Sequence, residues 1–142
     1  MSIAENAFYL AHRFADIELN SDVIPTLDAL GARYRLGVLS SGNSFPDRCG
    51  LGGRFQFLVF AQDHRVEKPD PRIFAIALEQ TGSTADQILH VGDSLQGDVL
   101  GARRAEIASV WLNRGRVPNP SDIQSDVEIS SLLELVSWFR RS

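Results

Sequence analysis

Residues 88–98, ILHVGDSLQGD, carry the most information about the fold of this chain. The apolar run at residues 88–91 is short and breaks into glycine and polar residues, which is typical of a buried β-strand that delivers a loop. Asp93 follows the strand directly, and Asp98 comes five residues later in the first part of a predicted helix. A buried strand that leads through polar residues into a helix indicates one repeat of an α/β fold.

Strands and helices alternate along the rest of the chain. Apolar runs predict further strands over residues 35–39, 57–61, 108–112 and 127–129. Helical spacing of apolar residues predicts helices over residues 4–19, 22–34, 70–82 and 132–139. This alternation predicts an α/β protein with a doubly wound parallel sheet covered on both faces, in which ligands bind beyond the carboxyl ends of the strands.

Composition limits the function classes. The chain has 142 residues, a formal net charge of −4 and one cysteine, Cys49. The charge argues against nucleic acid or an anionic membrane surface as partner, and one cysteine excludes an internal disulfide and a cysteine-based zinc site. No apolar stretch is long enough to span a bilayer, and residues 1–10 lack the basic start of a signal peptide. We therefore expect a cytoplasmic protein.

Small polar residues follow the predicted strand at residues 35–39. Ser40 and Ser41 supply hydroxyl groups, and Gly42 allows the backbone to turn and expose its amides. Hydroxyls together with amides form a small anion-binding cradle. The alternative is that these residues only cap the next segment, since serine is common at such positions.

Lys68 is the single lysine among 14 basic residues, the others being arginine. It lies in the sequence EKPDP, and the following Pro69 restricts its backbone to extended geometry. A compact ammonium group held in this way can be directed at an anion, whereas arginine presents a planar fork. The alternative is a solvated loop lysine, which is the usual environment of this residue.

Asp93 and Asp98 form the third cluster. Two carboxylates facing one cleft favour a hard divalent cation, above all Mg²⁺. The alternative is that both acids only stabilise the start of a helix. A hydroxyl loop, an ammonium group and a carboxylate pair at three strand ends together predict a phosphoryl-binding site.

These three segments resemble the second, third and fourth motifs of the haloacid dehalogenase (HAD) superfamily. The matching stretches are LSSGN at 39–43, EKPDPRIF at 67–74 and HVGDSLQGDVLGA at 90–102. The resemblance implies a HAD-like, Rossmann-type three-layer core and Mg²⁺-dependent phosphohydrolase chemistry on a phosphorylated small molecule. It further implies that Ser40 (or Ser41) binds the phosphoryl group, Lys68 neutralises its charge, and Asp93 binds Mg²⁺ with support from Asp98. The GDSLQGD form is similar to the phosphatases and differs from the metal-free dehalogenases.

The first motif of the superfamily, Asp-x-Asp, does not occur in the sequence. Its first aspartate is the nucleophile of the family, so we expect an N-terminally shortened hydrolase that is inactive. We expect residues 1–21 to be a remnant of a helical cap and residues 22–142 to be the core. The sheet is then expected to lack its usual first, central strand, which leaves two unpaired strand edges. A homodimer or an altered sheet would relieve this.

Two other function classes are compatible with parts of the sequence. The first is a non-catalytic HAD homologue that binds phosphate, Mg²⁺ or a protein partner, because covalent phosphoryl transfer requires the nucleophile. The second is a response-regulator-like receiver, which is disfavoured because its acidic pair should precede the lysine. A smaller departure is Glu106, which stands where the family pattern usually has glycine; a positive φ there would strain glutamate and leave the register of the next strand less certain.

Overall fold

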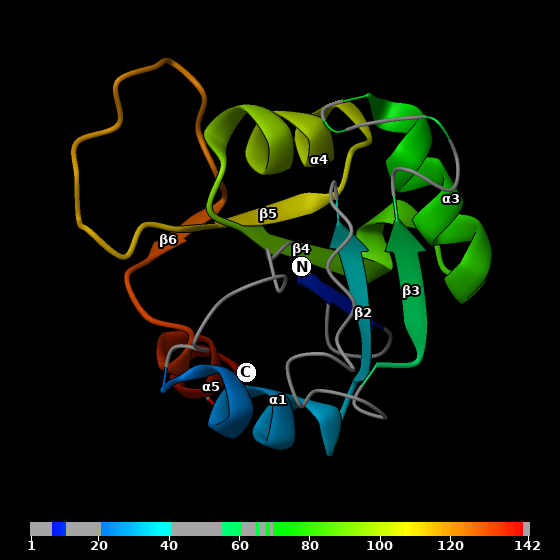
Figure 1. Ribbon diagram of the computed structural model, residues 1–142, viewed down its shortest axis with the longest axis horizontal. Helices are drawn as coiled ribbons and strands as arrows, with labels where there is room; N and C mark the ends of the chain where they lie inside the picture. The colour runs from blue at the N-terminus through cyan, green and yellow to red at the C-terminus, as the bar shows by residue number, and fades with distance from the viewer. Residues whose placement is uncertain are drawn as a thin grey trace.

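The chain forms one six-stranded parallel sheet in the order β3-β2-β1-β4-β5-β6 (Figure 1). The computed structural model describes residues 7–10, 21–40, 55–60, 65, 68 and 70–140. The strands are β1 (Ala7–Leu10), β2 (Arg35–Ser40), β3 (Phe57–Phe60), β4 (Ile88–Gly92), β5 (Ala108–Leu112) and β6 (Val127–Ile129). The predicted α/β fold with a doubly wound parallel sheet is confirmed.

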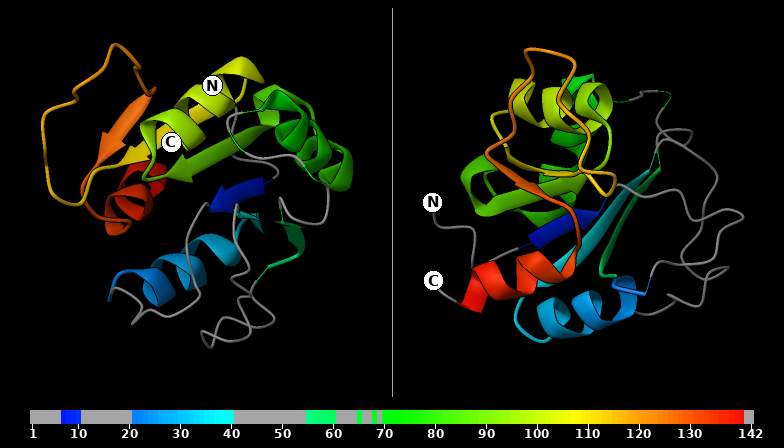
Figure 2. Two further views of the ribbon diagram at one scale, coloured as in Figure 1. Left: turned by 45° about the horizontal axis from the view of Figure 1, so that its top comes forward. Right: turned by 90° about the vertical axis from the view of Figure 1, so that its left-hand side faces the viewer.

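Helices cover both faces of this sheet. The α-helices are α1 (Val23–Gly31), α3 (Pro71–Thr81), α4 (Gly101–Arg104) and α5 (Leu133–Arg140). A 3₁₀ turn, η2 (Ala85–Gln87), precedes β4, and a π-helical segment, η3 (Leu95–Leu100), precedes α4. Helices α1 and α5 lie side by side on one face, and α3 and α4 cover the other (Figure 2). Among the described residues, no helix has the length and apolar character needed to cross a bilayer.

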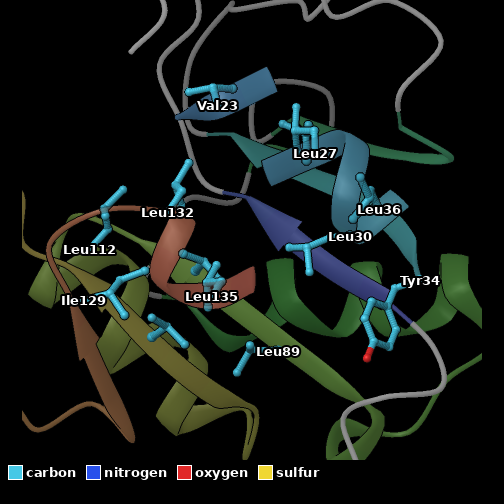
Figure 3. Close-up of a cluster of buried hydrophobic side chains, with 13 residues drawn as sticks. Val23, Leu27, Leu30, Tyr34, Leu36, Leu89, Leu112, Ile129, Leu132 and Leu135 are labelled. Carbon is cyan, nitrogen blue, oxygen red and sulfur yellow. The ribbon is translucent and has the colours of Figure 1, made fainter. Parts of the chain in front are cut away.

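Each helical layer packs on the sheet through its own apolar cluster. The larger cluster lies between α1, α5 and the sheet (Figure 3). Its helix members include Val23, Leu27, Leu30 and Leu135. The second cluster lies under α3 and α4 and includes Ile73, Phe74, Ile88 and Ala102. Apolar strand residues face both clusters, which is why the strand sequences are nearly continuous hydrophobic runs.

The central strand β1 differs from the prediction. We expected a helix over residues 4–19, but Ala7–Leu10 pairs in parallel with β2 on one side and β4 on the other. The expected absence of a central strand is therefore wrong as well, because this chain itself fills the position. The four residues AFYL suit a strand as well as a helix, and pairing with two buried strand edges outweighs the local helical spacing.

This pairing changes two further expectations. The homodimer or altered sheet followed from two unpaired edges, and β1 satisfies both edges within one chain. The structure therefore removes the reason for either. Ala7–Leu10, within the predicted cap remnant over residues 1–21, belong to the sheet. Residues 1–6 and 11–20 lie outside the described residues, so the division into cap remnant and core stays a prediction.

The other predicted strands lie within about a residue of their expected positions. From the sequence, Glu106 left the register of the following strand, β5, uncertain. Glu106 has φ of 61°, so the position does adopt the left-handed backbone expected for a glycine. The strand nevertheless begins at Ala108 as predicted, because the strain is confined to one residue.

Candidate active site

The predicted site residues that the structure describes lie at the carboxyl edge of the sheet. Val38 in β2 and Val91 in β4 are both level with Leu10 of β1. Ser40 and Asp93, each two residues further along, therefore lie at the same edge on either side of the central strand. Ser41 and Gly42 fall outside the described residues, so the predicted anion cradle is represented only by the backbone of Ser40.

Lys68 and Asp98 meet at this edge. The Lys68 Nζ lies 2.5 Å from Asp98 Oδ1, and the two side chains are only 9% and 2% exposed. A lysine this deeply enclosed is unusual unless its charge is paired. The contact joins the third and fourth of the predicted motifs through two residues that are 30 positions apart in the sequence.

Asp98 accepts two further hydrogen bonds. His90 Nε2 lies 3.0 Å from Oδ1, and the backbone N–H of Ser94 donates to Oδ2 at 3.1 Å. Burial by itself raises the pKa of Asp98, but the hydrogen bond from His90 and the charge of Lys68 outweigh it and lower the pKa to about 2. Burial also lowers the pKa of His90, which favours the neutral imidazole next to this carboxylate.

Gly92 makes room for this carboxylate. A Cβ atom at Gly92 would lie 2.2 Å from both Cγ and Oδ2 of Asp98, far inside van der Waals contact. The glycine is therefore required by close packing between the end of β4 and the side chain of Asp98.

Asp93 has a different environment from Asp98. Its residue is exposed at the edge of the sheet, while its carbonyl accepts a hydrogen bond from Nε1 of the buried Trp111 at 3.1 Å. The tryptophan fixes the backbone and leaves the carboxylate accessible. Of the two acids, Asp93 can contact a ligand directly, and Asp98 is already occupied by Lys68.

Carboxylate oxygens, such as those of Asp93, are the type of ligand that Mg²⁺ prefers. Mg²⁺ is commonly held by one or two carboxylates together with waters and substrate phosphate oxygens. Asp93 supplies one accessible carboxylate at the sheet edge where Lys68 and Asp98 meet. Within the part of the chain that the structure describes, no group of three or more histidine, cysteine, aspartate or glutamate residues could form an all-protein metal cage. A single accessible carboxylate such as that of Asp93 suits an ion that completes its coordination with water and phosphate oxygens.

The roles of two buried polar residues were not predicted from the sequence. His90 was included in the fourth motif but given no role, although a histidine in the apolar strand ILHVG is a visible signal. Asp22 stands at the start of the helix predicted over residues 22–34, and the sequence suggested no further role for it. It binds Arg114, at 2.8 and 3.1 Å, and no local pattern points to a partner 92 residues away.

A cavity of about 540 Å³ lies away from this edge, at the amino ends of β4 and β5. Its lining includes Asp86, Arg103, Glu106 and Ser109. None of the predicted site residues lines it. The predicted site residues that the structure describes lie instead at the carboxyl edge.

The fold and the site define an α/β protein with a buried lysine–aspartate pair and an exposed aspartate at the carboxyl ends of its parallel strands. A family model for haloacid dehalogenase-like hydrolases matches residues 3–106. The chain belongs to this family, as its resemblance in sequence predicted.

Individual relatives agree with this assignment. The chain is 34% identical over 118 residues to pyrimidine 5'-nucleotidase YjjG of Escherichia coli, covering 79% of this chain and 52% of the relative. It is 33% identical to glyceraldehyde 3-phosphate phosphatase of Methanopyrus kandleri, covering 90% and 59%. A 2-haloacid dehalogenase structure from Pseudomonas syringae superposes with a TM-score of 0.84 at 33% identity, covering 89% of this chain and 55% of that chain. The chain thus spans between half and three fifths of the length of these proteins.

Proposed function

We propose that this chain carries the phosphate- and magnesium-binding part of a HAD-like phosphohydrolase site. The observation that supports this most directly is the 2.5 Å contact between Lys68 Nζ and Asp98 Oδ1 at the carboxyl edge of the sheet. It unites two of the three predicted motifs at the place where ligands bind in such sheets. The ligand class is a phosphorylated small molecule or phosphate itself, in keeping with the phosphatases among its relatives.

Each residue has a distinct role in this proposal. Ser40 or Ser41, with the amides around Gly42, binds the phosphoryl oxygens, and Lys68 neutralises their charge. Asp93 is the magnesium ligand, and Asp98 supports the site by holding Lys68. Magnesium, when bound, would withdraw negative charge from the phosphoryl group.

The chain as given is proposed to turn over phosphate esters negligibly. The four residues of β1 (AFYL) include no acid, and the sequence contains no Asp-x-Asp. Positioning groups can bind a phosphoryl group but cannot replace the attacking carboxylate. A cytoplasmic location remains part of this proposal.

The second candidate is a non-catalytic homologue that binds phosphate, Mg²⁺ or a protein partner. The burial of the Lys68–Asp98 pair is compatible with it, since a preorganised ammonium group serves binding as well as catalysis. Turnover distinguishes the two candidates. Any longer form of the protein that contains an Asp-x-Asp would hydrolyse phosphate esters if the first candidate is right, and would not if the second is right.

Calorimetric titration with inorganic phosphate, with and without Mg²⁺, tests the site. We expect saturable binding that Lys68→Ala weakens by about tenfold, since a charge-assisted contact is lost. The matched control is Arg103→Ala, which removes one positive charge beside the distant cavity and should leave the affinity within twofold. Equal affinity of wild type and Lys68→Ala would show that the site assignment is wrong.

Hydrolysis of p-nitrophenyl phosphate with Mg²⁺ tests the absence of turnover. We expect no rate above buffer for the chain as given. Robust turnover that Asp93→Ala abolishes would overturn this part of the proposal, while leaving the binding site in place.

A further inference from the structure

His90 is a buried polar residue in the middle of an apolar strand. Its side chain is 1% exposed, and its Nε2 lies 3.0 Å from Asp98 Oδ1. A carboxylate only accepts hydrogen bonds, so the hydrogen-bond network assigns the ring proton to Nε2. Nδ1 then carries a bare lone pair, and it has no hydrogen-bond partner among the described residues.

An unpartnered buried nitrogen is unfavourable, and an apolar residue at this position would avoid it. The neighbouring residues Leu89 and Val91 show that β4 accepts apolar side chains. Packing alone therefore does not account for a histidine here. Among the described residues, the one favourable polar contact of the ring is the bond to Asp98.

The ring is held in a fixed orientation. Phe74 packs edge-on against it, with ring centroids 5.0 Å apart and an interplanar angle of 84°. Both residues are almost completely buried. The Nε2–H group is thus a rigid donor, since its strand and its ring plane are both fixed by the core.

We propose that His90 is a positioning residue that fixes Asp98 and, through it, the ammonium group of Lys68. His90 and Lys68 share Oδ1, and the Ser94 amide holds Oδ2. Three donors thereby fix both oxygens of a single carboxylate. Removing the His90 donor frees the carboxylate to rotate, and the ammonium group moves with it. This inference rests on the proposed function only for its effect on phosphate binding.

A residue that merely fills the core would behave differently. Its replacement would lower stability, but the state of Lys68 would not depend on whether the new side chain carries a donor. The test therefore needs a signal from the ammonium group itself. Lys68 is the single lysine, so labelling with ¹⁵N-lysine gives one Nζ signal in NMR spectra.

The experiment compares His90→Gln with His90→Met. Gln places an amide donor near the position of Nε2, whereas Met has a similar length and no donor. We expect hydrogen exchange at Lys68 Nζ to stay near the wild-type rate in His90→Gln and to rise about fivefold or more in His90→Met. We expect phosphate affinity to fall about tenfold in His90→Met, as is common when a supporting hydrogen bond is lost. Ile88→Val, a packing change on the same strand, should leave the Nζ signal unchanged.

The outcomes separate this inference from the proposed function. Equal Nζ exchange in the Gln and Met variants would overturn the positioning role, even if wild type binds phosphate. Absence of phosphate binding by wild type would overturn the proposed function, while the Nζ measurement without ligand still decides the role of His90. If His90→Met does not fold, His90→Asn replaces it, because Asn places its amide near Nδ1 and does not reach Asp98.

Discussion

Arg114 and Asp22, 92 residues apart, form a bidentate ion pair with distances of 2.8 and 3.1 Å. The same carboxylate accepts the backbone N–H of Leu132 at 2.8 Å and the hydroxyl of Ser131 at 3.1 Å. Although Asp22 precedes α1, its side chain makes no capping bond to that helix. It instead joins α1, the segment after β5 and the start of α5.

Asp22→Asn should lower the free energy of unfolding by about 2 kcal/mol, because Arg114 loses its charge partner and the buried donors lose a carboxylate. Urea denaturation at pH 7 measures this. Asp122→Asn, at an exposed position, is the control and should change stability by less than about 0.5 kcal/mol. Similar effects of the two substitutions would contradict the proposed role of Asp22 in joining the helices.

The contribution of Asp22 should also depend on pH. Burial raises the pKa of Asp22, but the hydrogen bonds from Arg114, Leu132 and Ser131 and the Arg114 charge outweigh it, so the pKa is below the ordinary value of 3.8. Its stabilising effect is therefore complete above that value and is lost as pH falls toward the lowered pKa. The stability difference between wild type and Asp22→Asn should shrink between pH 5 and pH 3. A stability difference that stays constant over this pH range would contradict the prediction.

Gly92→Ala should disrupt the site through direct overlap with Asp98. The new Cβ would lie 2.2 Å from the carboxylate, and we expect a loss of about 3 kcal/mol in unfolding free energy, together with weaker phosphate binding. Gly115→Ala is the control, because its Cβ would meet Val117 at 3.5 Å, an ordinary contact. Thermal unfolding and phosphate titration test both variants, and a Gly92→Ala protein that binds phosphate normally would contradict the packing argument.

Glu106→Gly should stabilise the protein by about 1 kcal/mol, because Glu106 has φ of 61° and glycine adopts this conformation without strain. Gly82→Ala provides the opposite case. Gly82 has φ of 68° and open space around its Cβ position, so alanine there should cost about 1 kcal/mol through backbone strain alone. Denaturant midpoints of the two variants should move in opposite directions, and equal shifts would count against this explanation.

Much of the fold could be predicted from local patterns. The strand at residues 88–92 and the helix at residues 71–81 have both an apolar pattern and clear end signals. Asp70 accepts the Arg72 amide at the helix start, and Gly82 ends the helix in the left-handed conformation. The central strand could not be predicted in this way. Its identity depends on pairing with β2 and β4, which no short stretch of sequence reveals.

The structure brings together two of the candidate site residues, whereas several of their contacts could not be predicted. Lys68 and Asp98 were both predicted as site residues, and the parallel sheet brings them together. The burial of Asp98 under His90 depends on how the π-helical segment η3 turns back over β4. The bond between Asp22 and Arg114 likewise depends on tertiary structure, because neither residue has a local pattern that selects the other.

The position of β1 has a consequence for the order in which the protein folds. Ala7 is level with both Arg35 and Ile88, so β1 pairs with one strand that follows it closely in the sequence and with another that is synthesised much later. On the ribosome, residues 7–10 must wait until β4 has emerged before they gain their second neighbour. Assembly of the middle of the molecule therefore involves closure of a long loop, which favours slow folding.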